Sequence, residues 1–346
     1  MRVLVTGGSG FIGTAITARL LRQGAQVLNV EGAGLGSSPE ALVGWMGSRR
    51  YRILKADICD IDAMLALFEE FQPDLVLNCA AENEVERSPS GATGYLRTNF
   101  LGTYTLLEAA RYWWAGRRGG YRFHQVSTDE VYGGLALGEP EIKDPVTAAP
   151  RTSFVASKAL ADHLVHAWGH AYNLPVVVTQ CADNYGPWQF PEKLIPSMIT
   201  NGIEGQALAL AGSGENVRGW VHVSDHADAV ARVVEHGQSG ETYRIDGAQQ
   251  QRNKEVIHQI CKRLDERIPD AAPHHRMISQ GIDHPVPRQY LEAASEKAAR
   301  QLGWRPNVDF REGLTSTVDW YLENKSWWRR LRGTQQPKKE RELETA

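Results

Sequence analysis

Two short stretches of the chain carry residue types that could do acid–base chemistry. The first is VSTDEVYGG, in which Asp129 and Glu130 directly follow Thr128. Two adjacent carboxylates repel each other, so one can stay protonated near neutral pH while the other is ionised. Such a pair would supply a general acid and a general base together. The alternative is an acidic pair that only forms a turn at the end of a strand.

The second stretch is TSFVASK, which predicts part of a helix. Phe154 and Lys158 are four positions apart, so their side chains lie on the same face of that helix. If the fold brings Lys158 together with the two carboxylates, the three side chains form a candidate active site.

A third stretch, TGGSGFIG, is typical of a loop that binds a dinucleotide. Gly7, Gly10 and Gly13 fall between a predicted strand and a predicted helix. Glycines at this spacing allow a tight turn, the close approach of a pyrophosphate and close packing of the helix on the strand. The N–H groups at the start of the helix then face the phosphates. An ordinary glycine-rich turn is the alternative.

Glu31, at the end of the next predicted strand, indicates which dinucleotide would bind. A carboxylate at this place accepts hydrogen bonds from both ribose hydroxyls and repels a 2′-phosphate. We therefore expect NAD rather than NADP. The alternative is that Glu31 is a surface residue of the segment EGAGLG.

The elements that would position these groups alternate between strand and helix. Short apolar runs predict strands at 2–7, 26–30, 74–81, 121–128 and 174–180. Helical periodicity between them predicts helices such as 13–24 and 60–72. This alternation predicts an α/β fold with a Rossmann-type, doubly wound parallel sheet.

The second half of the chain is richer in Pro, Gly and Trp, which favours a smaller, interleaved C-terminal substrate lobe. We expect an NAD-binding domain at 1–181, to which 219–246 returns through the strands WVHV and ETYRID. The substrate lobe would comprise 182–218 and 247–333. Residues 334–346 are polar and without periodicity, so a disordered tail is expected there.

Composition excludes several classes of protein. The chain has 346 residues, a net charge of −3 and 42% apolar residues, so it can bury a core and has no charge excess for binding nucleic acid. It shows no signal peptide and no apolar run of membrane-spanning length. The four scattered cysteines indicate free thiols in a reducing compartment. A soluble, cytoplasmic protein with no membrane or nucleic-acid partner is expected.

Two weaker signals have simple interpretations. The histidines of ADHLVHAWGHAY, at 163, 166 and 170, have helical spacing, but the proposed chemistry needs no metal, so we expect exposed histidines and no metal site. The segment SWWRRLRG could touch a membrane or a partner. Packing of Trp327 or Trp328 on the second lobe, with the arginines outside, is the favoured interpretation.

The order of several motifs resembles that of the dTDP-glucose 4,6-dehydratases, a branch of the extended short-chain dehydrogenase/reductase superfamily. The resemblance covers residues 1–325, and STDEVYG and NYGPWQFPEKLIP are its most specific parts. The remaining motifs are GGSGFIG, ADICD, AAENEVERS, TNFLGTYTLLEAAR, ASKALADHLV and RGWVHVSDHADA.

The resemblance implies a lyase that holds NAD tightly and recycles it. The sugar C4 hydroxyl is oxidised, which acidifies the C5–H. Glu130 would remove that proton, and Asp129 would protonate the departing C6 hydroxyl. Thr128 would hydrogen-bond the C4 oxygen, and Lys158 would hold the nicotinamide ribose. Hydride returns to C6 in the 4,6-dehydratases, and its return to C4 would give a 5,6-dehydratase.

The resemblance also implies binding residues and a partner. The cofactor would meet Gly7, Gly10, Phe11, Ile12, Gly13, Glu31, Asp57, Ile58, Ala80, Ala81, Asn99 and Lys158. The substrate would meet Glu82, Asn184, Glu192, Lys193, Arg218 and Arg288. The apolar helices predicted at 103–114 and 157–168 would pair with their counterparts in a homodimer.

The chain departs from the family first at Phe154, where the family carries the catalytic Tyr. Phe has no hydroxyl to accept the C4 proton. Three interpretations remain. The Tyr was replaced to trap a complex, another base such as Glu130, Tyr132 or a water held by Thr128 and Lys158 acts instead, or the chain has kept only binding.

Further departures fall on the nucleotide side of the expected substrate. Ala209 and Ala211 stand where the family has a Pro-x-Tyr segment, and Arg244 stands where it has Asn. In HPVPRQY only Arg288 and Tyr290 match. These changes favour a nucleotide sugar other than dTDP-glucose, or a nucleoside with a sugar-like hydroxymethyl group, in antibiotic or other specialised biosynthesis. An epimerase and a non-catalytic NAD-binding protein are the competing function classes.

Overall fold

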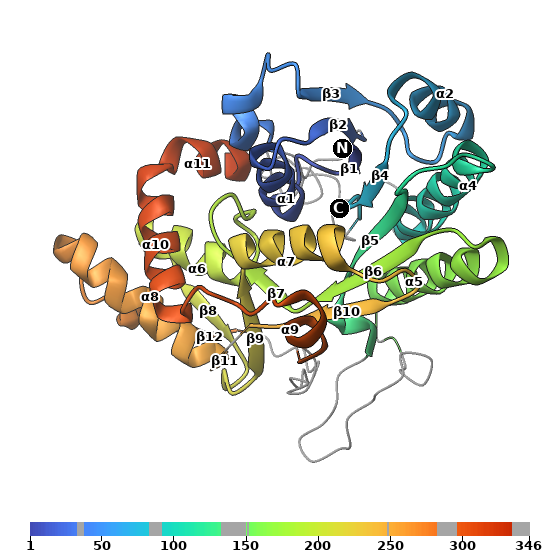
Figure 1. Ribbon diagram of the computed structural model, residues 1–346. Coiled ribbons are helices and arrows are strands. Elements are labelled where there is room, and N and C mark those ends of the chain that lie inside the picture. The colour runs from blue at the N-terminus through green and yellow to red at the C-terminus, as the bar shows by residue number, and fades with distance from the viewer. Residues whose placement is uncertain are drawn as a thin grey trace, which may run out of the picture.

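The computed structural model describes residues 1–32, 38–82, 92–132, 150, 152–247, 249–281 and 296–333. Its centre is a seven-stranded parallel sheet in the order β10-β6-β5-β4-β1-β2-β3 (Figure 1). This arrangement confirms the predicted Rossmann-type α/β fold. The strands are β1 (Arg2–Thr6), β2 (Gln26–Glu31), β3 (Tyr51–Lys55), β4 (Leu75–Asn78), β5 (Arg122–Thr128), β6 (Val176–Cys181) and β10 (Thr242–Ile245).

Helices cover both faces of this sheet (Figure 1). On β1, Leu4 packs with residues of α2, α4 and α5, whereas Val3 and Val5 pack with residues of α1 and α7 on the opposite face. Because both faces are covered, the central strands consist of apolar runs rather than alternating patterns. The helices are α1 (Phe11–Arg22), α2 (Ile61–Phe71), α4 (Thr103–Trp114), α5 (Ser153–Tyr172) and α7 (Val223–His236).

Helix α4 is preceded by an irregular helical segment. The short helix α3 (Ala92–Tyr95) runs directly into a π-helical segment, η2 (Leu96–Gly102), before α4 begins. Gly102 allows η2 to approach Ile58, because a Cβ at position 102 would lie 2.5 Å from Ile58 Cδ1. Two 3-10 helices, η1 (Pro39–Trp45) and η3 (Asp129–Tyr132), follow β2 and β5 along the chain.

The second lobe has its own apolar core, around residues such as Tyr185, Ile257 and Tyr321. Its strands form a three-stranded sheet, β11-β9-β7, and a two-stranded sheet, β12-β8. They are β7 (Asp183–Tyr185), β8 (Leu208–Ala211), β9 (Val217–His222), β11 (Gln250–Arg252) and β12 (Ile278–Gly281). The helices are α6 (Leu194–Ile203), α8 (Asn253–Arg267), α9 (Glu296–Leu302), α10 (Phe310–Glu323) and α11 (Lys325–Gly333).

One strand expectation is corrected. The segment WVHV was expected to join the large sheet, but β9 pairs with β7 and β11 instead. Only β10, from ETYRID, returns to the large sheet, where it pairs with β6. The run of apolar residues in β9 identifies a strand, but the choice of its partner depends on where the chain lies after β6.

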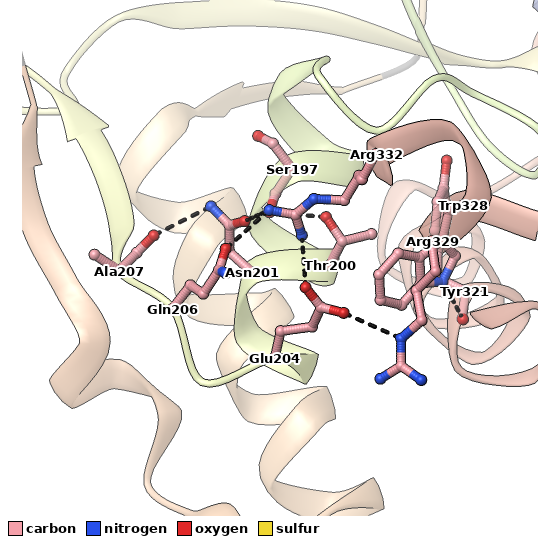
Figure 2. Close-up of polar contacts among 10 residues, drawn as sticks. All are labelled: Ser197, Thr200, Asn201, Glu204, Gln206, Ala207, Tyr321, Trp328, Arg329 and Arg332. Atoms are coloured by element: carbon pink, nitrogen blue, oxygen red, sulfur yellow. Dashed lines mark hydrogen bonds and ion pairs between the residues drawn. The ribbon is translucent and has the colours of Figure 1, made fainter. Parts of the chain in front are cut away.

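Helix α11 packs on the core of the second lobe and also contacts η1. Trp328 is fully buried and its indole N–H donates to Tyr321 O at 2.9 Å, which confirms the expected packing of SWWRRLRG. Arg332 donates to Asn201 Oδ1 and Gln206 Oε1, both at 2.8 Å, at the end of α6 (Figure 2). Arg330 pairs with Glu40 of η1.

Within the described ranges, no helix is both long and apolar enough to cross a membrane. The same part of the chain contains no group of three or more His, Cys, Asp or Glu side chains placed to hold a metal ion. His163 and His170 are exposed on α5, and His166 Nε2 lies 2.9 Å from Thr242 Oγ1.

Candidate active site

Two positions of the glycine loop, Gly7 and Gly13, have no room for a side chain. Gly7 has φ +65°, and a Cβ there would lie 2.8 Å from Ala80 Cα, after β4. A Cβ on Gly13 would lie 2.0 Å from the carbonyl oxygen of Gly7. The loop therefore lies tightly against the start of α1 and the end of β4. In the sheet order, β1 and β4 flank the switch point where nucleotides bind to folds of this kind.

Two side chains of β2, Asn29 and Glu31, hold the glycine loop in place by accepting hydrogen bonds from its backbone. The backbone N–H of Gly8 donates to Asn29 Oδ1 at 2.9 Å, and that of Ser9 donates to Glu31 Oε1 at 2.5 Å. The predicted carboxylate at position 31 thus reaches the loop. Asn29 was not predicted from the sequence. A buried Asn in a strand is a signal that could have indicated it, because a buried amide requires polar partners.

The remaining predicted cofactor residues line the ends of neighbouring strands. Asp57 forms an ion pair with Arg97 at 2.6 Å, and Ile58 is buried against η2. Burial opposes ionisation of Asp57, but the hydrogen bond from Arg97 and the N–H of Cys59 bring its pKa below the usual value. The side chain expected to meet adenine, Asp57, is therefore already paired with Arg97.

Asn99 of η2 connects the end of β4 to helix α5. Its side chain donates to Glu82 O at 3.0 Å and to Ser157 Oγ at 2.9 Å, and it accepts from the N–H of Glu82 at 2.8 Å. The N–H of Ala80 donates to Thr6 Oγ1 at 3.2 Å. The predicted residues from Ala80 to Glu82 therefore lie beside both the glycine loop and α5.

The predicted catalytic residues come from β5, η3 and α5. Thr128 ends β5, and its hydroxyl accepts from the N–H of Glu130 at 3.3 Å. Asp129 and Glu130 begin η3 and are half-buried. Phe154 and Lys158 lie one turn apart on α5, which packs directly against β5 and η3. The fold thus brings the two chemically promising stretches together.

Lys158 belongs to a buried network that the sequence did not reveal. The residue is 3% exposed, and its ammonium donates to Val126 O at 2.8 Å. Asp162, one turn further along α5, is also buried and accepts from Gln180 Nε2 at 2.9 Å. Burial raises the pKa of Asp162 to about 6, although Lys158 acts against this shift. Burial likewise lowers the pKa of Lys158, and the Asp162 charge opposes it.

Three aspartates lie near Cys181, where β5, β6 and β10 end and β7 begins. Burial raises the pKa of the Cys181 thiol well above its usual value, and the charges of Asp129, Asp246 and Asp183 raise it further. Desolvation also raises the pKa of Asp246 to about 6, against the effect of Arg244. Thr128 and Ile245 both pair with Cys181 in the sheet, so these groups share one edge.

Three of the predicted substrate residues, Asn184, Glu192 and Lys193, belong to the segment that opens the second lobe. Asn184 Oδ1 lies 3.0 Å from Nδ1 of the buried His226, and burial lowers the pKa of that imidazole to about 4. Asn184 therefore faces a neutral histidine. Glu192 and Lys193 directly precede α6. Arg288 lies outside the described residues.

Two arginines on the nucleotide side have partners within the protein. Arg218, expected to meet a diphosphate, forms an ion pair with Asp183 at 3.0 Å across β9 and β7. Arg244 lies over the ring of Tyr132, 4.4 Å from its centroid. Ala209 is exposed on β8 and, as an alanine, offers no aromatic ring to a base.

Comparison with known proteins agrees with this geometry. The family profile described as GDP-mannose 4,6 dehydratase matches residues 4–317. The chain belongs to this dehydratase family. dTDP-glucose 4,6-dehydratase 1 of Escherichia coli K12 is 42% identical over 340 residues, covering 94% of each chain. A probable dTDP-glucose 4,6-dehydratase of Sinorhizobium fredii is 43% identical over 337 residues, covering 96% of each.

Two solved structures have the same fold as this chain. The dTDP-glucose 4,6-dehydratase of Bacillus anthracis, in complex with NAD, has a TM-score of 0.84 at 34% identity, covering 96% of this chain and 99% of that one. UDP-glucose 4-epimerase of Thermotoga maritima, with UDP-glucose, has a TM-score of 0.80 at 25% identity, covering 94% of this chain and 100% of that one. The resemblance to the dTDP-glucose 4,6-dehydratases within the extended short-chain dehydrogenase/reductase superfamily is thus confirmed.

Proposed function

We propose that the chain is an NAD-dependent lyase that transiently oxidises a sugar C4 hydroxyl and eliminates water across C5–C6. The substrate would be a nucleotide sugar or a related nucleoside, whose C3′ hydroxyl, C4′–H and C5′ hydroxyl would take the places of the C4 hydroxyl, C5–H and C6 hydroxyl. The observation that carries this proposal is the position of Asp129 and Glu130 directly after β5, where α5 with Lys158 packs against η3. An epimerase does not need an acid for a departing hydroxyl, so the pair favours elimination.

NAD fits the residues at the switch point between β1 and β4. Gly7 and Gly13 leave the room that a pyrophosphate needs, and the carboxylate of Glu31 lies at the loop where a 2′-phosphate would be repelled. Bound NAD would accept hydride from C4 and return it after elimination. The B. anthracis relative in complex with NAD supports the same assignment.

The chain's own residues would move the protons. Glu130 would take the C5 proton once C4 is a ketone, and Asp129 would give a proton to the C6 oxygen as water leaves. Adjacent carboxylates can hold these opposite protonation states because each disfavours ionisation of the other. Thr128 would orient the C4 oxygen. The proposal leaves hydride return to C6 or to C4 as its two outcomes.

The substrate assignment can be tested with a small panel. The purified protein, loaded with NAD, is incubated separately with dTDP-glucose, UDP-glucose, thymidine and uridine, and the products are analysed by mass spectrometry. We expect at least one product that is lighter by one water. A change of configuration without loss of water would contradict the lyase and favour an epimerase. Binding without any product would favour a non-catalytic protein.

We also propose a homodimer through α4 and α5. Large apolar side chains are exposed on these helices and on η2, including Leu101, Tyr112, Leu160 and Tyr172. The two helices pack side by side, so a second copy could cover the same surface around a two-fold axis. A cytoplasmic location stays a prediction, supported by the four free cysteines.

The dimer can be tested by light scattering at micromolar concentration. We expect the mass of two chains for the native protein and of one chain for Leu160→Glu, because a buried charge without a partner would oppose association. Val43→Glu is the control, since Val43 is 69% exposed on η1, away from these helices. A native protein that scatters as one chain would contradict the proposal.

A further inference from the structure

The side chain that meets Phe154 is a tyrosine. The ring centroids of Tyr95 and Phe154 are 6.1 Å apart, and the rings meet edge to face at 60°. Tyr95 is 2% exposed, whereas Phe154 is half-buried. The position that lacks a hydroxyl is therefore in direct contact with a residue that carries one.

Hydrogen bonds between the two helical segments hold these rings together. Four residues after Tyr95, Asn99 donates to Ser157 Oγ at 2.9 Å, and Ser157 in turn donates to Phe154 O at 2.7 Å. The α3–η2 segment therefore contacts α5 at two neighbouring places. Tyr95 packs on Phe154, and Asn99 hydrogen-bonds to Ser157. Tyr95 directly precedes the π-helical turn η2, and π-turns are frequent at functional sites.

The surroundings suit a phenol that exchanges a proton. Lys158, one turn after Phe154 on the same face of α5, brings a buried cation to this part of the site. A nearby cation stabilises a phenolate, whereas burial of the phenol opposes its ionisation. Asn99 also hydrogen-bonds to the backbone of Glu82, two residues after Ala80, which lies against Gly7 of the glycine loop.

We propose that Tyr95 supplies the proton-accepting hydroxyl that Phe154 lacks. This inference rests on the proposed function. In the oxidation step, the O–H bond at C4 breaks and its proton passes to the Tyr95 phenolate oxygen, directly or through one water. The O–H electron pair forms the C4=O bond, and the C4 hydrogen leaves with its electron pair to oxidised NAD. The reverse transfers restore both groups after elimination.

Exchanging the two rings tests the proposal. With whichever of dTDP-glucose, UDP-glucose, thymidine and uridine the native protein dehydrates, NADH absorbance is followed in a single turnover of NAD-loaded protein. Tyr95→Phe should slow hydride transfer by about 10²–10⁴-fold, as expected for loss of a general base. The double variant with Phe154→Tyr should recover at least about tenfold relative to Tyr95→Phe, because a phenol again stands at the same contact. Full activity of Tyr95→Phe, or a double variant as slow as Tyr95→Phe, would overturn the proposal.

A second measurement does not depend on turnover. The near-ultraviolet absorbance of tyrosinate is titrated in NAD-loaded protein, and Tyr95→Phe is subtracted from the native protein to isolate one of the eleven tyrosines. We expect Tyr95 to ionise below the ordinary phenol pKa of about 10. Ionisation at or above that value would overturn the proposal even if dTDP-glucose is not a substrate. Failure of the whole substrate panel, with a lowered Tyr95 pKa, would instead count against the proposed lyase function alone.

Discussion

Replacing Glu130 with glutamine is expected to lower the rate of dehydration by about 10²–10⁴-fold, the usual cost of losing a general base. Glutamine keeps the size and the backbone contact with Thr128 Oγ1 but cannot accept the C5 proton. The measurement is the amount of dehydrated product formed per unit time from the substrate that the panel identifies. Oxidation at C4 precedes this proton transfer, so NADH should still form.

Asp129→Asn separates the acid from the base. This variant should oxidise the substrate but expel the C6 hydroxyl slowly, so NADH absorbance should accumulate in a single turnover. Glu69→Gln is the control, because Glu69 is exposed on α2, which packs against α4 and is not part of the candidate site. If Glu130→Gln keeps full activity, the elimination mechanism is wrong, and the chain is better described as an epimerase or a binding protein.

The second large effect is expected at the glycine loop. Gly13→Ala places a methyl group 2.0 Å from the carbonyl oxygen of Gly7, so the loop or α1 must move. A shifted loop can no longer direct its N–H groups at a pyrophosphate. We expect the purified variant to carry at least about tenfold less dinucleotide than the native protein and to lose turnover in proportion.

The bound dinucleotide is released by denaturation and identified by chromatography against standards. Native protein should release NAD or NADH, and NADP as the main species would contradict the argument from Glu31. Gly44→Ala is the control substitution, since nothing lies within 4 Å of a Cβ at that position. A Gly13→Ala protein with a full complement of NAD would show that the loop tolerates displacement.

The local elements of the fold could be predicted from the sequence because each carries its own signal. The apolar run of β6 and the periodicity of α4 depend only on neighbours along the chain. The glycine loop and Glu31 could be predicted because their spacing reflects one strand–loop–helix unit. Sheet membership was harder, and β9 was misplaced because nothing in its residues identifies the strand beside it.

The buried networks of the site could not be predicted for the same reason. Asp162 meets Gln180 only because α5 lies across β5 and β6, where Ser127 is paired with Gln180. Tyr95 meets Phe154 through the packing of two helical segments far apart in the sequence. These contacts are set by the relative placement of elements, and a single sequence does not encode that placement in any local pattern.

The position of β10 has a consequence for synthesis of the protein on the ribosome. Strand β6 is buried along its whole length, yet its outer edge is covered by β10, whose Thr242 pairs with Val178. The ribosome makes β10 only after residues 182–241, which form β7, α6, β8, β9 and α7. During that interval β6 exposes unpaired backbone groups, the kind of edge that recruits other chains. Slow translation through residues 182–241 would prolong this exposure, so expression conditions that shorten it, or chaperones that bind an open edge, should raise the yield of folded protein.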